Sequence, residues 1–342
     1  MKLAFITGIT GQDGSYLTEL LLEKKYKVYG IVRRTSLLYS STRLDHIRDK
    51  ITLKYGDMTD CAGLFRYILS IVSENHDFTV LEIYNLAAQS HVKISFELPE
   101  YTSHVDGTAV GNLLEIIRSL PTEIQGKIKF YQAGTSEMYG KVLQTPQNEK
   151  TPFNPVSPYA AAKLYAYYMT KCYRDGYNLF AVNGILFNHE SPRRGKNFVT
   201  MKIVNCVKDI VDGKKTYMEL GNLDSKRDWG HAKDYVRGMW GMLQQKKPDD
   251  YVLATGKTYT IREFVERSFL HKNIKIKWIG KGLDEVGYDE NKQIRVRINP
   301  KYFRPCEVEL LLGDPKKAIL KLGWYREFDT LDKLIHDMFE GK

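Results

Sequence analysis

Residues 2–22 read KLAFITGITGQDGSYLTELLL, and this stretch decides the fold. Its first part, Lys2–Thr7, is a short apolar run typical of a buried parallel strand, and the apolar spacing after Gly14 is that of a helix. Between them, Gly8, Gly11 and Gly14 allow a tight turn and a close approach of the backbone to a diphosphate, which the amides and dipole of a helix N-terminus attract. The stretch therefore predicts a dinucleotide-binding turn, the alternative being an ordinary strand–helix turn.

Two arginines follow the second predicted strand, which spans residues 27–32. A site for NAD usually carries an acidic residue at this point, where it binds the ribose 2′-hydroxyl. Arg33 and Arg34 stand there instead, and a guanidinium group suits a 2′-phosphate. The sequence therefore favours NADP over NAD, while a solvated basic strand end is the simpler interpretation.

Strand and helix patterns continue to alternate as far as about residue 185, which predicts a parallel sheet with helices on both faces. Further strands are expected at 52–56, 81–86, 127–134 and 179–186. The alternation then weakens, with long loops expected at 188–196, 221–230 and 280–290 and helices at 198–211, 232–243 and 261–270. The predicted fold class is α/β: a Rossmann-type doubly wound parallel sheet with a smaller, interleaved C-terminal lobe. We expect a cofactor domain at 1–187, returns to the sheet at about 215–260, and a substrate-binding lobe formed mainly by 188–342.

A tyrosine and a lysine four residues apart form the clearest catalytic pattern, in SPYAAAKL at 157–164. Proline followed by alanines favours a helix that begins near Tyr159, so that Tyr159 and Lys163 share one face. A free phenol is a weak base at neutral pH, but a nearby ammonium group lowers its pKa. The pair is expected to remove a proton from a hydroxyl group while hydride leaves the same carbon. Most isolated pairs of this spacing are surface residues, so the pattern depends on the dinucleotide turn.

Composition limits the remaining possibilities. The chain of 342 residues carries a net charge of +10, but its basic residues are dispersed among acidic ones, so nucleic-acid binding is not expected. Four scattered cysteines lack metal-like spacing, and no zinc or calcium site is expected. The start lacks the pattern of a signal peptide and no apolar run is long enough to span a bilayer, so we expect a cytoplasmic protein without a membrane partner.

Several long motifs resemble the extended short-chain dehydrogenases/reductases and, within them, the GDP-mannose 4,6-dehydratase family. They are TGITGQDGSYL at 7–17, IVRR at 31–34, YNLAAQSHVKISF at 84–96, TSEMYG at 135–140, SPYAAAKLYAY at 157–167, NGILFNHESPRRG at 183–195, LGNLDSKRDWGHAKDYV at 220–236 and FRPCEVE at 303–309. The resemblance covers essentially the whole chain.

The resemblance implies conversion of GDP-mannose to GDP-4-dehydro-6-deoxy-mannose and water, with NADP as the cofactor. In this mechanism Tyr159 takes the proton of the 4-hydroxyl group, Lys163 holds the nicotinamide ribose and keeps the phenol acidic, and Thr135 binds the developing ketone. Glu137 removes the proton of carbon 5 and then protonates the departing 6-hydroxyl group. From position alone, Thr135 is equally well a turn hydroxyl and Glu137 a surface carboxylate.

The resemblance also implies two sets of binding residues. Those for the cofactor are Gly8, Thr10, Gly11, Gln12, Asp13, Arg33, Arg34, Asp57, Met58, Leu86, Ala88, Ser90, Tyr101, Lys163, His189 and Arg194. Those for GDP-mannose are Ser90, Asn188, Lys202, Arg227, Arg304 and Glu307. Arg34 matches a residue that in related tetramers helps to build a cofactor site shared with a neighbouring subunit. A homodimer or homotetramer is therefore expected.

Other functions remain open at this point. One is a different nucleotide-sugar epimerase or reductase on the same fold, including side reduction of the product to GDP-rhamnose. Another is a non-catalytic NADP-binding protein. An epimerase needs no acid–base group for the loss of water, so Glu137 is the residue that separates dehydration from epimerisation.

Overall fold

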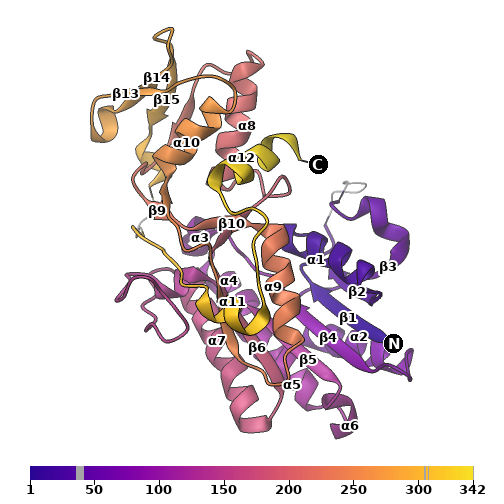
Figure 1. Ribbon diagram of the computed structural model, residues 1–342. Helices are drawn as coiled ribbons and strands as arrows, with labels where there is room; N and C mark the ends of the chain where they lie inside the picture. The colour runs from indigo at the N-terminus through magenta and orange to yellow at the C-terminus, as the bar shows by residue number, and fades with distance from the viewer. Residues whose placement is uncertain (36–41, 304–305, 307, 342) are drawn as a thin grey trace.

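A computed structural model describes residues 1–35, 42–303, 306 and 308–341. Its centre is a seven-stranded sheet in the order β11-β6-β5-β4-β1-β2-β3, and every pairing in it is parallel (Figure 1). The strands are β1 (Lys2–Thr7), β2 (Lys27–Val32), β3 (Ile51–Tyr55), β4 (Val80–Asn85), β5 (Ile128–Ala133), β6 (Phe180–Leu186) and β11 (Asp250–Leu253). The predicted doubly wound parallel sheet is confirmed.

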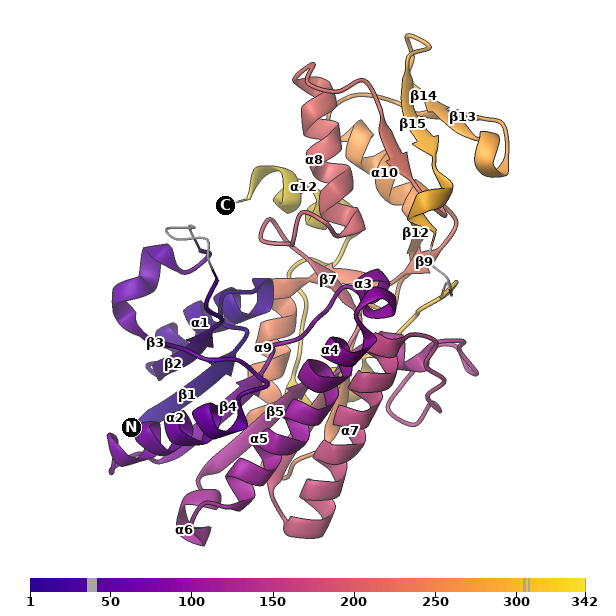
Figure 2. The same cartoon turned by 180° about the vertical axis from the view of Figure 1, so that it is seen from behind.

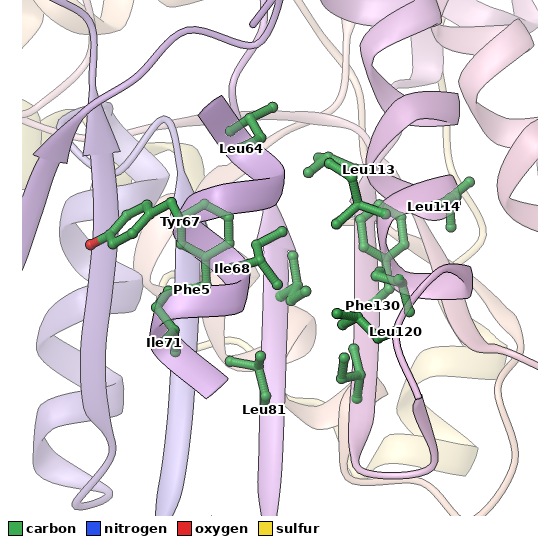
Figure 3. Packing of buried hydrophobic residues seen from close by; sticks show 14 of the residues in the cluster. Phe5, Leu64, Tyr67, Ile68, Ile71, Leu81, Leu113, Leu114, Leu120 and Phe130 are labelled. Carbon is green, nitrogen blue, oxygen red and sulfur yellow. The ribbon is translucent and has the colours of Figure 1, made fainter. Parts of the chain in front are cut away.

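Helices cover both faces of this sheet. On the face seen in Figure 2 lie α2 (Cys61–Ser73), α5 (Ala109–Arg118) and α7 (Pro158–Tyr177), together with the short α3 (Val92–Glu97), α4 (Pro99–Ser103) and α6 (Thr122–Gln125). The opposite face packs against α1 (Gln12–Glu23) and α9 (Ala232–Leu243), with α11 (Lys316–Leu322) beside them. Figure 3 shows Ile68 of α2 and Leu113 of α5 above Phe5 and Phe130 of the sheet. Each fully buried side chain of this kind contributes roughly 1.5–3 kcal/mol.

The second lobe is built from α8 (Val199–Val211), α10 (Ile261–Leu270) and α12 (Leu331–Glu340) around a separate apolar core. Its four-stranded sheet has the order β13-β14-β15-β8. These strands are β13 (Lys277–Ile279), β14 (Val286–Tyr288), β15 (Ile294–Ile298) and β8 (Met218–Leu220). The chain passes back and forth between the lobes: β11 and α11 return to the large sheet before α12 closes the second lobe (Figure 1). The lobes are therefore interleaved, as the sequence predicts.

The three helices predicted after residue 187 are present as α8, α9 and α10, although α9 packs on the large sheet. The predicted loops contain short strands. β7 (Asn188–Glu190) pairs with β10 (Trp229–His231), β9 (Lys226–Arg227) pairs with β12 (Tyr259–Thr260), and β14 lies in the third loop. Strands of two or three residues show no periodicity, so the loop prediction missed them. In the part of the chain that the structure describes, no helix combines the length and apolar character needed to cross a membrane.

Candidate active site

A cavity of about 890 Å³ lies between the two lobes, at the carboxyl ends of the large sheet's strands. The loops that follow β1, β4, β5 and β6 all reach it, because parallel strands end at the same edge of a sheet. The second lobe supplies the opposite wall through α8 and β9. This is where ligands bind in open α/β sheets, and it is one cavity rather than separate cofactor and substrate pockets.

The turn between β1 and α1 is shaped for a close backbone approach. Gly8 has φ +66°, and a Cβ there would lie 2.8 Å from the backbone nitrogen of Ala87. A Cβ on Gly14 would lie 2.4 Å from the carbonyl oxygen of Gly8. The N-cap of α1, Gly11, offers no side-chain cap, so the first amides of the helix face the cavity without one. These residues fit the diphosphate of a dinucleotide.

A partly buried ion pair joins the start of α1 to β7. His189 Nδ1 donates to the carbonyl oxygen of Phe187 at 2.8 Å, and its Nε2 lies 2.7 Å from Asp13 Oδ2. Burial alone would lower the pKa of His189, but the Asp13 carboxylate and these hydrogen bonds raise it overall. Burial likewise acts to raise the pKa of Asp13, but the charge of His189, hydrogen bonds from His189 and Gln12 and the charge of Arg194 together lower that pKa. Both ring nitrogens therefore donate, and the pair is ionic.

The predicted Tyr–Lys pair lies on the first turns of α7. Ser157 caps this helix by accepting from the backbone nitrogen of Ala160 at 3.1 Å, and Pro158 occupies its first turn. Tyr159 and Lys163 are 8% and 3% exposed, and Lys163 Nζ lies 6.0 Å from the centre of the phenol ring. The ammonium group also donates to the carbonyl oxygen of Ala133 at 3.1 Å, which fixes it beside the end of β5.

Lys163 is expected to lower the pKa of the Tyr159 phenol, but the net direction in the structure is upward. Burial and the negative charge of Asp106 raise the pKa of Tyr159 well above its ordinary value. A hydrogen bond with Thr135 and the charge of Arg194 act in the opposite direction but are weaker. The cause is desolvation of the phenolate, which the sequence pattern of a lysine four residues away does not reveal.

Asp106 is a buried carboxyl group that the sequence analysis missed. It lies on the π-helical turn His104–Thr108, and its Oδ1 accepts from the backbone nitrogen of Gln89 at 2.7 Å. Its Oδ2 is buried without a hydrogen-bond partner in the described residues. Burial raises the pKa of Asp106 to about 6, against the opposing charge of Lys163. Burial also lowers the pKa of Lys163, against the charge of Asp106.

Thr135 and Glu137 follow β5 and complete the inner end of the cavity, which we define as Thr135, Glu137, Tyr159 and Lys163. Thr135 is the N-cap of the 3₁₀ turn Ser136–Tyr139, and its hydroxyl accepts from the backbone nitrogen of Glu137 at 3.2 Å. Glu137 is 7% exposed and lines the cavity, so it is not a surface carboxylate. The inner end therefore holds a phenol, an ammonium group, a hydroxyl group and a carboxyl group together.

The outer end of the cavity, defined as Arg33, Asp57, Met58 and Tyr101, lies beyond β2 and β3. Arg33 Nη1 donates to the Tyr101 hydroxyl at 2.5 Å, and both side chains are exposed. Arg34 does not line the cavity, because its guanidinium group stacks 5.4 Å from the ring of Tyr55. The other predicted cofactor residues in the cavity wall are Gly8, Thr10, Gly11, Gln12, Asp13, Leu86, Ala88, Ser90, Lys163, His189 and Arg194.

Of the predicted GDP-mannose residues, four line the cavity: Ser90, Asn188, Lys202 and Arg227. Lys202 Nζ lies 3.4 Å from the centre of the Tyr302 ring and donates to the carbonyl oxygen of Glu219 at 2.6 Å. Arg304 and Glu307 lie outside the described residues. The sequence analysis missed the wall residues Glu190, Thr200, Trp229, Ile261 and Tyr302. Their local sequence has no pattern that predicts a place in the cavity wall, although Glu190, Trp229 and Tyr302 fall within or next to quoted motifs. Among the residues that the structure describes, no three His, Cys, Asp or Glu side chains form a cluster suited to a metal.

Sequence comparison identifies the family. The family model described as GDP-mannose 4,6 dehydratase matches residues 5–338. The chain belongs to this family. It is 54% identical to GDP-mannose 4,6 dehydratase of Drosophila melanogaster, over 99% of this chain and 86% of the relative. It is 52% identical to the Homo sapiens protein of the same name, over 98% and 90%. It is 51% identical to GDP-mannose 4,6-dehydratase of Yersinia enterocolitica, over 100% of this chain and 94% of the relative.

Solved structures confirm the fold alone. The dTDP-glucose 4,6-dehydratase of Bacillus anthracis, in complex with NAD, aligns with TM-score 0.76 at 19% identity, over 100% of this chain and 97% of that one. UDP-glucose 4-epimerase of Thermus thermophilus, also with NAD, aligns with TM-score 0.76 at 22% identity, over 100% and 99%. Dehydratases and epimerases thus share this architecture, and only site residues distinguish them.

Proposed function

We propose that the protein is a GDP-mannose 4,6-dehydratase, a hydro-lyase that forms GDP-4-dehydro-6-deoxy-mannose and water. The observation that carries this proposal is the buried carboxyl group of Glu137 beside Tyr159 and Lys163, in a chain that belongs to the dehydratase family. An epimerase has no need of such an acid–base group. No observation favours the epimerase or reductase alternative.

NADP is the proposed cofactor, and when bound it would supply reversible hydride transfer, between carbon 4 and carbon 6 of the sugar. The diphosphate fits the turn at Gly8–Gly14, where the backbone is closely packed and the helix amides are directed outward. Arg33 supports the choice of NADP, because an exposed guanidinium group at the end of β2 suits a 2′-phosphate. Lys163 is placed to hold the nicotinamide ribose.

Tyr159 is proposed as the base that accepts the proton of the 4-hydroxyl group. A raised pKa disfavours the phenolate, so the positive charge of Lys163 and the hydrogen bond with Thr135 must offset this effect during the reaction. Thr135 is placed to donate to the 4-ketone as it forms. The enclosed site strengthens these interactions, because water is excluded from both side chains.

Glu137 is proposed as the group that removes the proton of carbon 5, which the adjacent 4-ketone makes acidic. The same carboxyl group, now protonated, then gives its proton to the departing 6-hydroxyl group. Water leaves, and the cofactor ends the cycle unchanged. One carboxyl group therefore serves as base and acid in turn, which agrees with its enclosed position on the turn after β5.

The remaining parts of the proposal concern binding and assembly. Ser90, Asn188, Lys202 and Arg227 are proposed to hold GDP-mannose, since cationic side chains suit its diphosphate. Arg304 and Glu307 stay predictions from the motif. A cytoplasmic homodimer or homotetramer that acts early in the synthesis of GDP-fucose or GDP-rhamnose type sugars is also proposed, with Arg34 at a shared cofactor site.

Mass spectrometry of GDP-mannose incubated with the purified protein and catalytic NADP tests the proposal. A nucleotide sugar lighter by one water, with no net formation of NADPH, is the expected result. An unchanged mass would point to an epimerase, and excess NADPH that yields a rhamnose sugar would show the reductase side activity.

The variant Glu137→Gln separates the two halves of the reaction. Loss of the acid–base group should slow release of dehydrated product by about 100- to 10,000-fold. Oxidation at carbon 4 should persist, so that NADPH absorbance appears in a single turnover. Dehydrated product at the normal rate would contradict the role of Glu137.

A further inference from the structure

Two neighbouring arginines of the segment after β7 are held in opposite directions. Arg193 is turned towards α1, where its Nη2 lies 2.6 Å from Glu19 Oε1 and its guanidinium group 4.1 Å from the Tyr16 ring. Arg194 lines the cavity, and its guanidinium group stacks 3.8 Å from the ring of Phe198. The orientation of the Arg194 side chain is therefore set by contacts other than those that hold Arg193.

One such contact is with Glu190, the last residue of β7. Its Oε2 lies 3.0 Å from Arg194 Nε, and the Thr200 hydroxyl at the start of α8 donates to the same oxygen at 2.6 Å. Glu190 and Thr200 are 2% and 1% exposed. A carboxylate this well buried must stay paired, because an isolated buried charge is costly. The contact between Glu190 and Arg194 is an ion pair by distance, since Arg194 Nε has no hydrogen-bond partner in the described residues. Glu190, held by Thr200, thus fixes the negative charge that the Arg194 side chain faces.

The position of Arg194 suits an anionic part of the cofactor. Its charge contributes to lowering the pKa of Asp13, at the phosphate turn, and opposes the raised pKa of Tyr159, at the inner end. Arg194 therefore lies within electrostatic reach of both. A dinucleotide that runs from the phosphate turn to the inner end must pass between them, and its diphosphate is the group that a fixed guanidinium binds best.

We propose that Glu190, seated by Thr200, is a positioning residue that fixes the Arg194 guanidinium against the diphosphate of the cofactor. The proposal rests on the cofactor assignment given above, in which Arg194 is a predicted binding residue. Glu190 lines the cavity, and its proposed effect on the cofactor passes through Arg194.

Calorimetric titration with NADP and with NAD, without GDP-mannose, tests the proposal. Glu190→Gln should raise the Kd for the better-bound cofactor by about tenfold, and Thr200→Val should act in the same direction. Thr200→Ser keeps the hydroxyl group and should restore the Kd of the parent protein. Glu19→Gln, which removes the partner of the other arginine, is the matched control and should leave the Kd within about twofold. A tenfold change in Kd corresponds to about 1.4 kcal/mol.

A double-mutant cycle decides whether Glu190 acts through Arg194. Arg194→Ala should weaken cofactor binding, and Glu190→Gln/Arg194→Ala should be no weaker than Arg194→Ala alone. Independent, additive losses would overturn the proposal. An unchanged Kd in Arg194→Ala or in Glu190→Gln would overturn it too. If Glu190→Gln does not fold, an unchanged Kd in Thr200→Val has the same meaning. A parent protein that binds neither cofactor would overturn it together with the proposed function. Because no sugar is present, cofactor binding without turnover of GDP-mannose would count against the proposed activity alone. KM for GDP-mannose should change less than the cofactor Kd.

Discussion

At the inner end of the cavity Tyr159 and Lys163 are 8% and 3% exposed, whereas at the outer end Tyr101 is 36% exposed and Arg33 is also open to solvent. The inner side chains stand on α7 and on the turn after β5, both packed on the large sheet. At the outer end, Arg33 and Tyr101 are joined by a hydrogen bond between two exposed side chains. Enclosure gives the inner end strong electrostatic interactions at a cost in stability, while the outer end keeps its charge hydrated.

Removing the phenol should have the largest effect. Tyr159→Phe deletes the proposed base and keeps the ring, so kcat should fall by about 100- to 10,000-fold while NADP stays bound. Steady-state assay with calorimetric titration of NADP measures both quantities. Tyr168→Phe, on the exposed side of the same helix, is the matched control and should behave as the parent protein does. Normal turnover of Tyr159→Phe would show that Tyr159 is not the base. The burial of the inner end would then have no demonstrated role in catalysis.

A buried carboxyl group next to the inner end, that of Asp106, should cost stability in a way that depends on pH. Asp106 is fully buried and its pKa is raised to about 6 from 3.8, so the folded state binds its proton more tightly than the unfolded state does. Stability must then fall as the pH rises between these two values, by about 3 kcal/mol in total for a shift of about two units. Asp106→Asn keeps the shape and the bond from Gln89 and should lack this loss.

Urea denaturation of the parent protein and of Asp106→Asn at about pH 4 and about pH 7.5 measures the effect. From the lower to the higher pH, the free energy of unfolding should fall more for the parent protein than for Asp106→Asn. Asp332→Asn, at an exposed position on α12, should follow the parent at both values. If the stability of the parent and of Asp106→Asn depends on pH in the same way, the Asp106 carboxyl group titrates normally. Its burial next to the inner end then costs no stability.

The sequence predicted those parts of the molecule that depend on local patterns. The strand before Gly8 follows from an apolar run, and the helix after it from apolar spacing. The helix that begins at Pro158 follows from its proline and alanines, and the residues near the cavity follow from motifs at strand ends. Asp106 and the Glu190–Thr200 contact could not be predicted, because they depend on which segments the fold brings together. The direction of the Tyr159 pKa was predicted wrongly for the same reason. Burial decides it, and burial is a property of the whole fold.

The smallest expected effect belongs to the outer end. Arg33→Ala removes an exposed guanidinium group, so the loss is limited by hydration of the charge, and the Kd for NADP should rise by about tenfold. The Kd for NAD should stay within about twofold, because NAD has no 2′-phosphate for Arg33 to meet. Arg66→Ala, an exposed arginine of α2 outside the cavity wall, controls for the general loss of positive charge. Higher salt should reduce the difference between NADP and NAD in the parent protein, since exposed charges are screened, and should change little at the enclosed inner end. Equal losses for both cofactors would mean that Arg33 shapes the outer end without reading the 2′-phosphate, and the contrast between the two ends would then be one of burial alone.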